Sequence, residues 1–225
     1  MSFSLWIDPS FGASGDMLLG AFAEMVNDPK QAISPLRDLA LEDWHIDFEK
    51  TLRNGLNATK AEVTYHETST GRKWSEIDAL LKDSSLPSQV IEGSRRTFRL
   101  LAEVEAGQHG VAIDDVHFHE VGAVDAILDV VGTWLLRFAL EDEVDAIDEI
   151  VVGAVGLGSG SVKASHGTLP LPAPATIGIL KDCAVTDVST NSETCTPTGA
   201  ALLVSMANRW GNIPSGYIRK SSRGA

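Results

Sequence analysis

The chain has 225 residues, of which 44% are hydrophobic, and it carries 31 acidic against 18 basic residues for a formal net charge of −13. A chain of this size and composition can bury a substantial core, so we expect a globular protein. The acidic balance excludes the basic surface that nucleic acid or an anionic membrane attracts. Composition therefore predicts no nucleic-acid or membrane partner and favours a cation as ligand.

Cysteine usage and the lack of long apolar runs indicate a cytoplasmic protein. Cys183 and Cys195 are the only two cysteines and form no Cys-x-x-Cys pair, so neither a disulfide framework nor a zinc knuckle is indicated. No apolar run approaches the roughly 18 residues of a membrane-spanning helix, and the first apolar segment is too short for a signal peptide.

The apolar periodicity predicts an α/β fold of alternating strands and helices, with strand order left open. A β-hairpin excursion is expected near residues 44 to 66, because two alternating segments flank an Asn54-Gly55 turn. The other expected elements are a strand at 3–7, helices at 17–22, 35–41, 73–82, 87–107 and 123–139, a strand at 146–154, and helices at 173–181 and 196–208.

The segment from His117 to Asp125 carries the densest group of side chains that can bind a metal or move a proton. In an extended backbone, His117 and His119 lie on one face and can present two imidazoles to one ion. Glu120 and Asp125 follow closely, and a carboxylate can orient a ligating imidazole. The alternative is that the two histidines are a structural pair without a ligand.

Two aspartates near the start form a second candidate. Asp8 lies at the carboxyl end of the first expected strand, where function often collects in α/β folds. Asp16 follows Gly12-Ala13-Ser14-Gly15 at the start of an apolar helix, and together the two carboxylates can hold a cation. The alternative is that Ser14 or Asp16 only caps the helix and Asp8 closes a turn.

A glycine-rich segment after the 146–154 strand is the third candidate. Its backbone at Gly156, Gly158, Ser159 and Gly160 can approach a phosphate or a planar ring closely, although it matches neither a P-loop nor a dinucleotide fingerprint. Further candidates downstream are Lys163 as a cation, His166 as a metal ligand or turn residue, and Cys195 as a soft-metal ligand or a packed residue.

Four sequence segments resemble those of a known protein family. HFHEVGAVDAILDVVG around His117 closely resembles the signature of the nickel insertion proteins called LarC, which mature the nickel-pincer nucleotide cofactor of lactate racemase. IDPSFGASGDMLLGA, GLGSGSVKASHGTLPLPAPATIGILK and TPTGAALL resemble the same family in the same order. The stretch from about 26 to 106 matches only loosely.

The resemblance implies a cyclometallase, a lyase-type enzyme that inserts nickel into pyridinium-3,5-bisthiocarboxylic acid mononucleotide. It also implies CTP with manganese or magnesium, associated in the family with a carboxyl-terminal half. We therefore expect residues 1–210 to form a single α/β domain that resembles the amino-terminal part. Residues 211–225 are expected to be a flexible tail or the start of a linker to a carboxyl-terminal domain, which would be a partner of this chain. The sequence is equally compatible with a frameshift product, a truncated gene or a fragment, and it leaves homo-oligomerisation open.

Within that reading, His117, His119, Asp8, Asp16 and His166 are the candidate metal ligands, and Glu120 and Asp125 are the candidate catalytic carboxylates. Nickel must be held loosely enough to pass to a sulfur-bearing ligand, while a base removes the proton from the carbon that becomes metal-bound. A metallochaperone that delivers nickel without catalysis and a metal-dependent hydrolase remain as alternatives.

Overall fold

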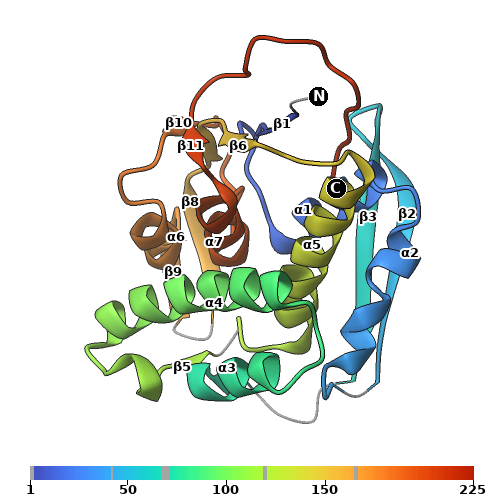
Figure 1. Cartoon of the computed structure of the whole chain (residues 1–225). Coiled ribbons are helices and arrows are strands. Elements are labelled where there is room, and N and C mark those ends of the chain that lie inside the picture. The colour runs from blue at the N-terminus through green and yellow to red at the C-terminus, as the bar shows by residue number, and fades with distance from the viewer. Residues whose placement is uncertain (1–2, 42, 67–70, 119–120, 165–166) are drawn as a thin grey trace.

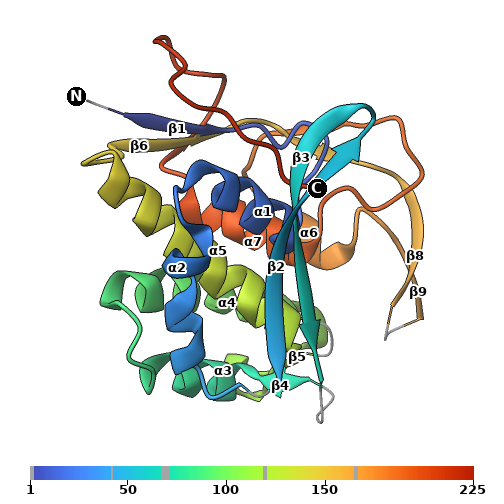
Figure 2. The same cartoon turned by 90° about the vertical axis from the view of Figure 1, so that its right-hand side faces the viewer.

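A three-stranded parallel sheet lies at the edge of the molecule. The computed structural model describes residues 3–41, 43–66, 71–118, 121–164 and 167–225. β1 (Ser4–Ile7) and β11 (Arg209–Trp210) flank β6 (Glu149–Val152). β6 is the most apolar and buried of these strands, as expected for the centre of a parallel sheet. Helices cover the inner face of the sheet (Figure 2). The α/β class predicted from the sequence is confirmed.

Helix α5 (Val124–Glu143) runs through the centre of the molecule, and the other long helices surround it (Figure 1). The helices that pack against it are α1 (Gly15–Met25), α4 (Ser88–His109) and α7 (Pro197–Met206). The remaining helices are α2 (Pro29–Ala32), α3 (Trp74–Lys82), α6 (Pro174–Ile179) and the short 3₁₀ helices η1 (Ser34–Asp38) and η2 (Ile113–Asp115). The helices expected from periodicity at 17–22, 73–82, 87–107, 123–139, 173–181 and 196–208 are confirmed, with ends that differ by a few residues.

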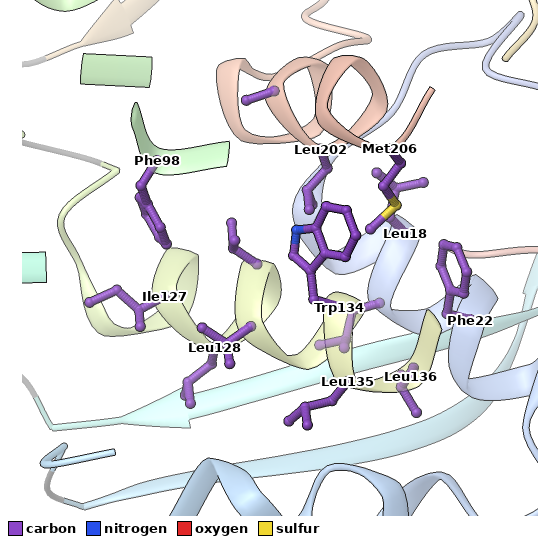
Figure 3. Close-up of a cluster of buried hydrophobic side chains, with 14 of the residues drawn as sticks. Leu18, Phe22, Phe98, Ile127, Leu128, Trp134, Leu135, Leu136, Leu202 and Met206 are labelled. Atoms are coloured by element: carbon purple, nitrogen blue, oxygen red, sulfur yellow. The ribbon is translucent and has the colours of Figure 1, made fainter. Parts of the chain in front are cut away.

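The core lies where α1, α4, α5 and α7 meet (Figure 3). Trp134 of α5 points between α4 and α7, and its indole N–H donates to the Thr97 hydroxyl at 3.0 Å. A Cβ on Gly93 would lie 2.5 Å from the Trp134 ring, so the glycine provides the space for the indole. Hydrogen bonds therefore link Trp134, Thr97 and Ser205, because Thr97 in turn donates to Ser205 at 2.9 Å.

The predicted β-hairpin is present and packs on α1 and α5. β2 (Trp44–Arg53) pairs with β3 (Leu56–Tyr65) in an antiparallel register, and Asn54 and Gly55 both have positive φ at the turn. This geometry is the one that the Asn-Gly pair favours. α1 approaches the hairpin so closely that a Cβ on Gly20 would lie 2.2 Å from the Thr59 carbonyl oxygen.

Two expectations about local structure were wrong. Residues 35–41 do not form an α-helix, because η1 (Ser34–Asp38) overlaps them. The buried residues in and beside η1, Ile33, Leu36 and Leu39, follow the three-residue period of a 3₁₀ turn. The strand expected at 146–154 is divided, because β6 covers only Glu149–Val152 and a second strand enters the glycine-rich segment. β7 (Val155–Leu157) pairs with β10 (Val185–Asp187), and β8 (Gly160–Ala164) forms a hairpin with β9 (Gly167–Leu171).

Residues 211–225 return across the molecule to the hairpin (Figure 1). Thr59 of β3 donates its N–H to the Arg223 carbonyl at 2.8 Å and accepts from the Ala225 N–H at 3.1 Å. The boundary between a domain of residues 1–210 and a flexible tail or linker stays a prediction. Among the described residues, no helix is both long and apolar enough to cross a bilayer.

Candidate functional site

Three chain segments meet beyond the carboxyl ends of β1 and β6. We call them the loop junction: residues 8–15, 156–160 and 190–196. The Gly156 N–H donates to the Pro9 carbonyl at 2.8 Å, and the Thr196 N–H donates to the Ala13 carbonyl at 3.0 Å. The helices α1 and α7 both begin at this place. The fold thus unites segments that are far apart in the sequence.

The Thr194 side chain links two segments of the loop junction by hydrogen bonds. Its hydroxyl accepts a hydrogen bond from the Gly158 N–H at 2.9 Å and donates to the Gly156 carbonyl at 2.8 Å. The sequence analysis did not select Thr194. Its position two residues before the Thr196 helix cap was the available signal.

The glycines of the junction allow backbones to touch. A Cβ added to Gly12 would lie 1.9 Å from the carbonyl oxygen of Thr194. A Cβ on Gly156 would lie 2.0 Å from the Ser10 carbonyl oxygen, and one on Gly158 would lie 2.3 Å from the Ser192 carbonyl oxygen. The close neighbour at these positions is therefore the protein's own backbone. Ser159, Gly160 and Lys163 are exposed. The cofactor-binding role of Gly156, Gly158, Ser159, Gly160 and Lys163 stays a prediction.

The start of α1 lies against the second turn of α5. A Cβ on Gly15 would be 2.6 Å from Oδ2 of Asp129, so the glycine leaves the space that this carboxylate fills. Ser14 occupies the cap position of α1 but forms no side-chain cap bond, and its hydroxyl donates to the Asp16 carboxylate. Ser14 thus lies at the cap position without a capping hydrogen bond from its side chain.

Asp129 carries a buried carboxylate oxygen, Oδ1, that has no hydrogen-bond partner among the described residues. Burial, followed by the negative charges of Asp16 and Asp125, raises the pKa of Asp129 well above its ordinary value. The sequence analysis did not select Asp129 as a site residue. An acid inside the apolar run of α5 was the signal.

The structure brings some of the predicted site residues together and separates others. The negative charges of Asp16 and Asp125 both raise the pKa of Asp129. Asp125 Oδ1 also accepts a hydrogen bond from the Ala126 N–H at 2.8 Å. Asp8 is exposed, accepts the Ser10 N–H at 3.1 Å, and lines a cavity of about 1660 Å³ between β1, α1 and residues 213–224.

His117 is exposed on β5 (His117–Phe118), which pairs with β4 (Arg72–Lys73). The predicted partners His119, Glu120 and His166 lie outside the described residues. In the part of the chain that the structure describes, no three His, Cys, Asp or Glu side chains are arranged to hold a metal ion. The His-x-His metal site therefore stays a prediction.

Cys195 is packed at the loop junction. Burial raises the pKa of its thiol to about 12, and the Glu193 charge also raises it. A thiol must lose its proton to bind a soft metal, so this environment favours the packed interpretation over the ligand interpretation.

Comparison with known proteins gives one consistent result. A family described as nickel insertion protein matches residues 5–225. A pyridinium-3,5-bisthiocarboxylic acid mononucleotide nickel insertion protein of Staphylococcus saprophyticus is 39% identical over 95% of this chain and 53% of its own length. The corresponding protein of a Nocardioides species is 40% identical over 93% and 52%, and a putative nickel insertion protein of Thermomicrobium roseum is 41% identical over 90% and 49%.

The chain spans about half the length of the curated relatives that it matches. No solved structure matches it. Both the family match and the identity to these relatives extend over nearly all of the sequence, including the segments of the loop junction and of α5. The chain therefore belongs to the nickel insertion protein family.

Proposed function

We propose that this chain is the amino-terminal part of a protein that inserts nickel into pyridinium-3,5-bisthiocarboxylic acid mononucleotide, yielding the nickel-pincer cofactor of lactate racemase. One observation carries the proposal: relatives named for this activity match 95% or more of the chain in several cases. The loop junction supports it, because it joins segments that carry the family resemblance. We expect the protein to work in the cytoplasm.

Nickel is the cargo of the proposed reaction. His117 and His119 bind it through imidazole nitrogens, which suit nickel and remain exchangeable toward sulfur ligands. A carbon–hydrogen bond of the pyridinium ring breaks and a carbon–nickel bond forms, so a base must accept the proton. Glu120 and Asp125 are the proposed bases, and Asp125 lies in the first turn of α5. The backbone of Gly156, Gly158, Ser159 and Gly160, with Lys163, is the proposed contact for the nucleotide.

The complete reaction is proposed to need a second part. The sequence contains no P-loop or dinucleotide fingerprint, so we assign CTP with manganese or magnesium to a carboxyl-terminal half. A shared site requires correct relative placement of both parts, and a covalent link raises their effective concentration. The chain alone is therefore expected to be inactive, the mixed halves weakly active and a fused protein fully active.

The test measures the nickel-pincer nucleotide by mass spectrometry after incubation of purified precursor with nickel, manganese and CTP. The carboxyl-terminal half is taken from the Staphylococcus saprophyticus relative. Full CTP-dependent turnover by residues 1–225 alone would contradict the division of labour. Stoichiometric nickel transfer without CTP consumption would instead indicate a metallochaperone, and turnover of a phosphoester or amide without a nickel product would indicate a hydrolase.

A further inference from the structure

Three carboxylates gather where α1 and α5 begin: Asp16, Asp125 and Asp129. None of them forms an ion pair with a lysine, arginine or histidine among the described residues. Each of the other two has a hydrogen-bond donor, Ser14 for Asp16 and the Ala126 N–H for Asp125. In the part of the chain that the structure describes, Asp129 has no donor at its buried Oδ1 atom.

A buried carboxylate beside two other acids must be neutralised by a proton or by a cation. Oδ1 of Asp129 has no hydrogen-bond partner among the described residues, and an unsatisfied buried oxygen costs stability. A metal ion would satisfy this oxygen and would also remove the repulsion among the three acids. The space is fixed by Gly15, since any larger residue there would meet Asp129.

We propose that Asp129 and Asp16 together bind a hard divalent cation, Mg²⁺ or Mn²⁺, at the joined starts of α5 and α1. Carboxylate oxygens are the ligands that these ions prefer, whereas imidazoles suit nickel. Such ions are commonly held by one or two carboxylates, with water or substrate oxygens in the remaining positions. The site therefore does not require a third protein ligand, in agreement with the lack of a three-ligand group among the described side chains.

Asp125 contributes charge to this site. The Oδ1 atom of Asp125 already accepts a hydrogen bond from the Ala126 N–H. Asp125 is therefore not assigned as a ligand, and its negative charge attracts the ion from nearby. Ser14 orients Asp16 by donating to its carboxylate. A role for this cation in nickel insertion rests on the proposed function, but the binding itself does not.

The test is calorimetric titration of the whole chain with Mn²⁺, without nucleotide or nickel. Wild-type protein is expected to bind one Mn²⁺, and Asp129→Asn or Asp16→Asn is expected to weaken this binding by roughly tenfold or more. Asp142→Asn is the matched control, because Asp142 is an exposed carboxylate on the same helix. It should bind Mn²⁺ like the wild type.

Thermal unfolding separates loss of a ligand from loss of the fold. Asp129→Asn removes a buried charge that lacks a partner, so the metal-free variant should unfold at the same temperature as the wild type or higher. Mn²⁺ should raise the unfolding temperature of the wild type and of Asp142→Asn but not of Asp129→Asn. Asp16→Asn provides a second variant if Asp129→Asn fails to fold.

Equal Mn²⁺ affinity in wild type, Asp129→Asn and Asp16→Asn would overturn the inference, as would a wild-type chain that binds no Mn²⁺ at millimolar concentration. Product formation by the fused protein in either of these cases would leave the proposed function intact. Conversely, Mn²⁺ binding lost in Asp129→Asn without any nickel-pincer product would support this site and contradict the proposed function.

Discussion

Replacement of both His117 and His119 by alanine is expected to abolish stoichiometric nickel binding while it leaves the unfolding temperature of the metal-free protein nearly unchanged. His117 is exposed on the two-residue strand β5, so its imidazole contributes little to the core. In the wild type, nickel affinity should fall as the pH is lowered, because protonated imidazole cannot coordinate a metal. Calorimetric titration with nickel at several pH values measures both effects.

His45→Ala is the matched control for the histidine pair. His45 is also an exposed histidine on a strand, and its ring lies 2.8 Å from the Asp47 carboxylate on the same hairpin. This variant should bind nickel with wild-type stoichiometry. Unaltered nickel binding by the double variant would remove the His-x-His pair from the nickel site.

Gly12→Ala should have the largest effect on stability, because it affects both the backbone conformation and the packing of the loop junction. Gly12 has a φ of +102°, which side chains rarely adopt, and the new Cβ would lie 1.9 Å from the Thr194 carbonyl oxygen. Backbone strain and overpacking each cost about 1–3 kcal/mol, so we expect a loss of roughly 2–6 kcal/mol. Urea denaturation measures this free energy of unfolding.

Gly55→Ala separates these two causes. Gly55 has a φ of +80° at the hairpin turn, but no atom lies within 4 Å of a Cβ built there. Only the conformational cost remains, so the expected loss is about 1 kcal/mol. A loss at Gly12 no larger than that at Gly55 would show that the junction yields easily, contrary to the close packing described above.

Periodicity predicted the long elements because each has one strongly apolar face. Helix α5 is the clearest case: Ile127, Val130, Val131 and Trp134 carry the helical spacing and are all buried. The Asn54-Gly55 turn predicted the hairpin because its chemistry fixes the turn conformation locally. These features depend on a few neighbouring residues, so they can be predicted from the sequence alone.

The errors occurred where local signals are ambiguous. Three apolar residues spaced by three, Ile33, Leu36 and Leu39, fit both an α-helix and a 3₁₀ turn. Prolines concealed strand β9, in which Pro170 pairs with Ser161. A proline is tolerated there because a two-stranded hairpin leaves unpaired edges, and only the final topology reveals such an edge.

The segments that form the candidate site could be predicted from the sequence, but the contacts between these segments could not. The sequence identified the segments around Asp16, Asp125 and Gly156, and the first two share one environment in the structure. It did not identify Asp129 as a site residue or Thr194 as the side chain that joins two segments. A local signal marked each residue, but both roles depend on contacts between distant parts of the chain, which local patterns do not specify.

The most direct test of the central claim is anomalous diffraction at the nickel edge from a crystal of the protein soaked with nickel. The claim is that this chain holds the nickel cargo through the segment that begins at His117. We expect an anomalous peak within coordination distance, about 2.0–2.1 Å by analogy with other metal–imidazole bonds, of an imidazole nitrogen of His117. A nickel peak bound only at other histidines, such as His45 or His109, would contradict the account.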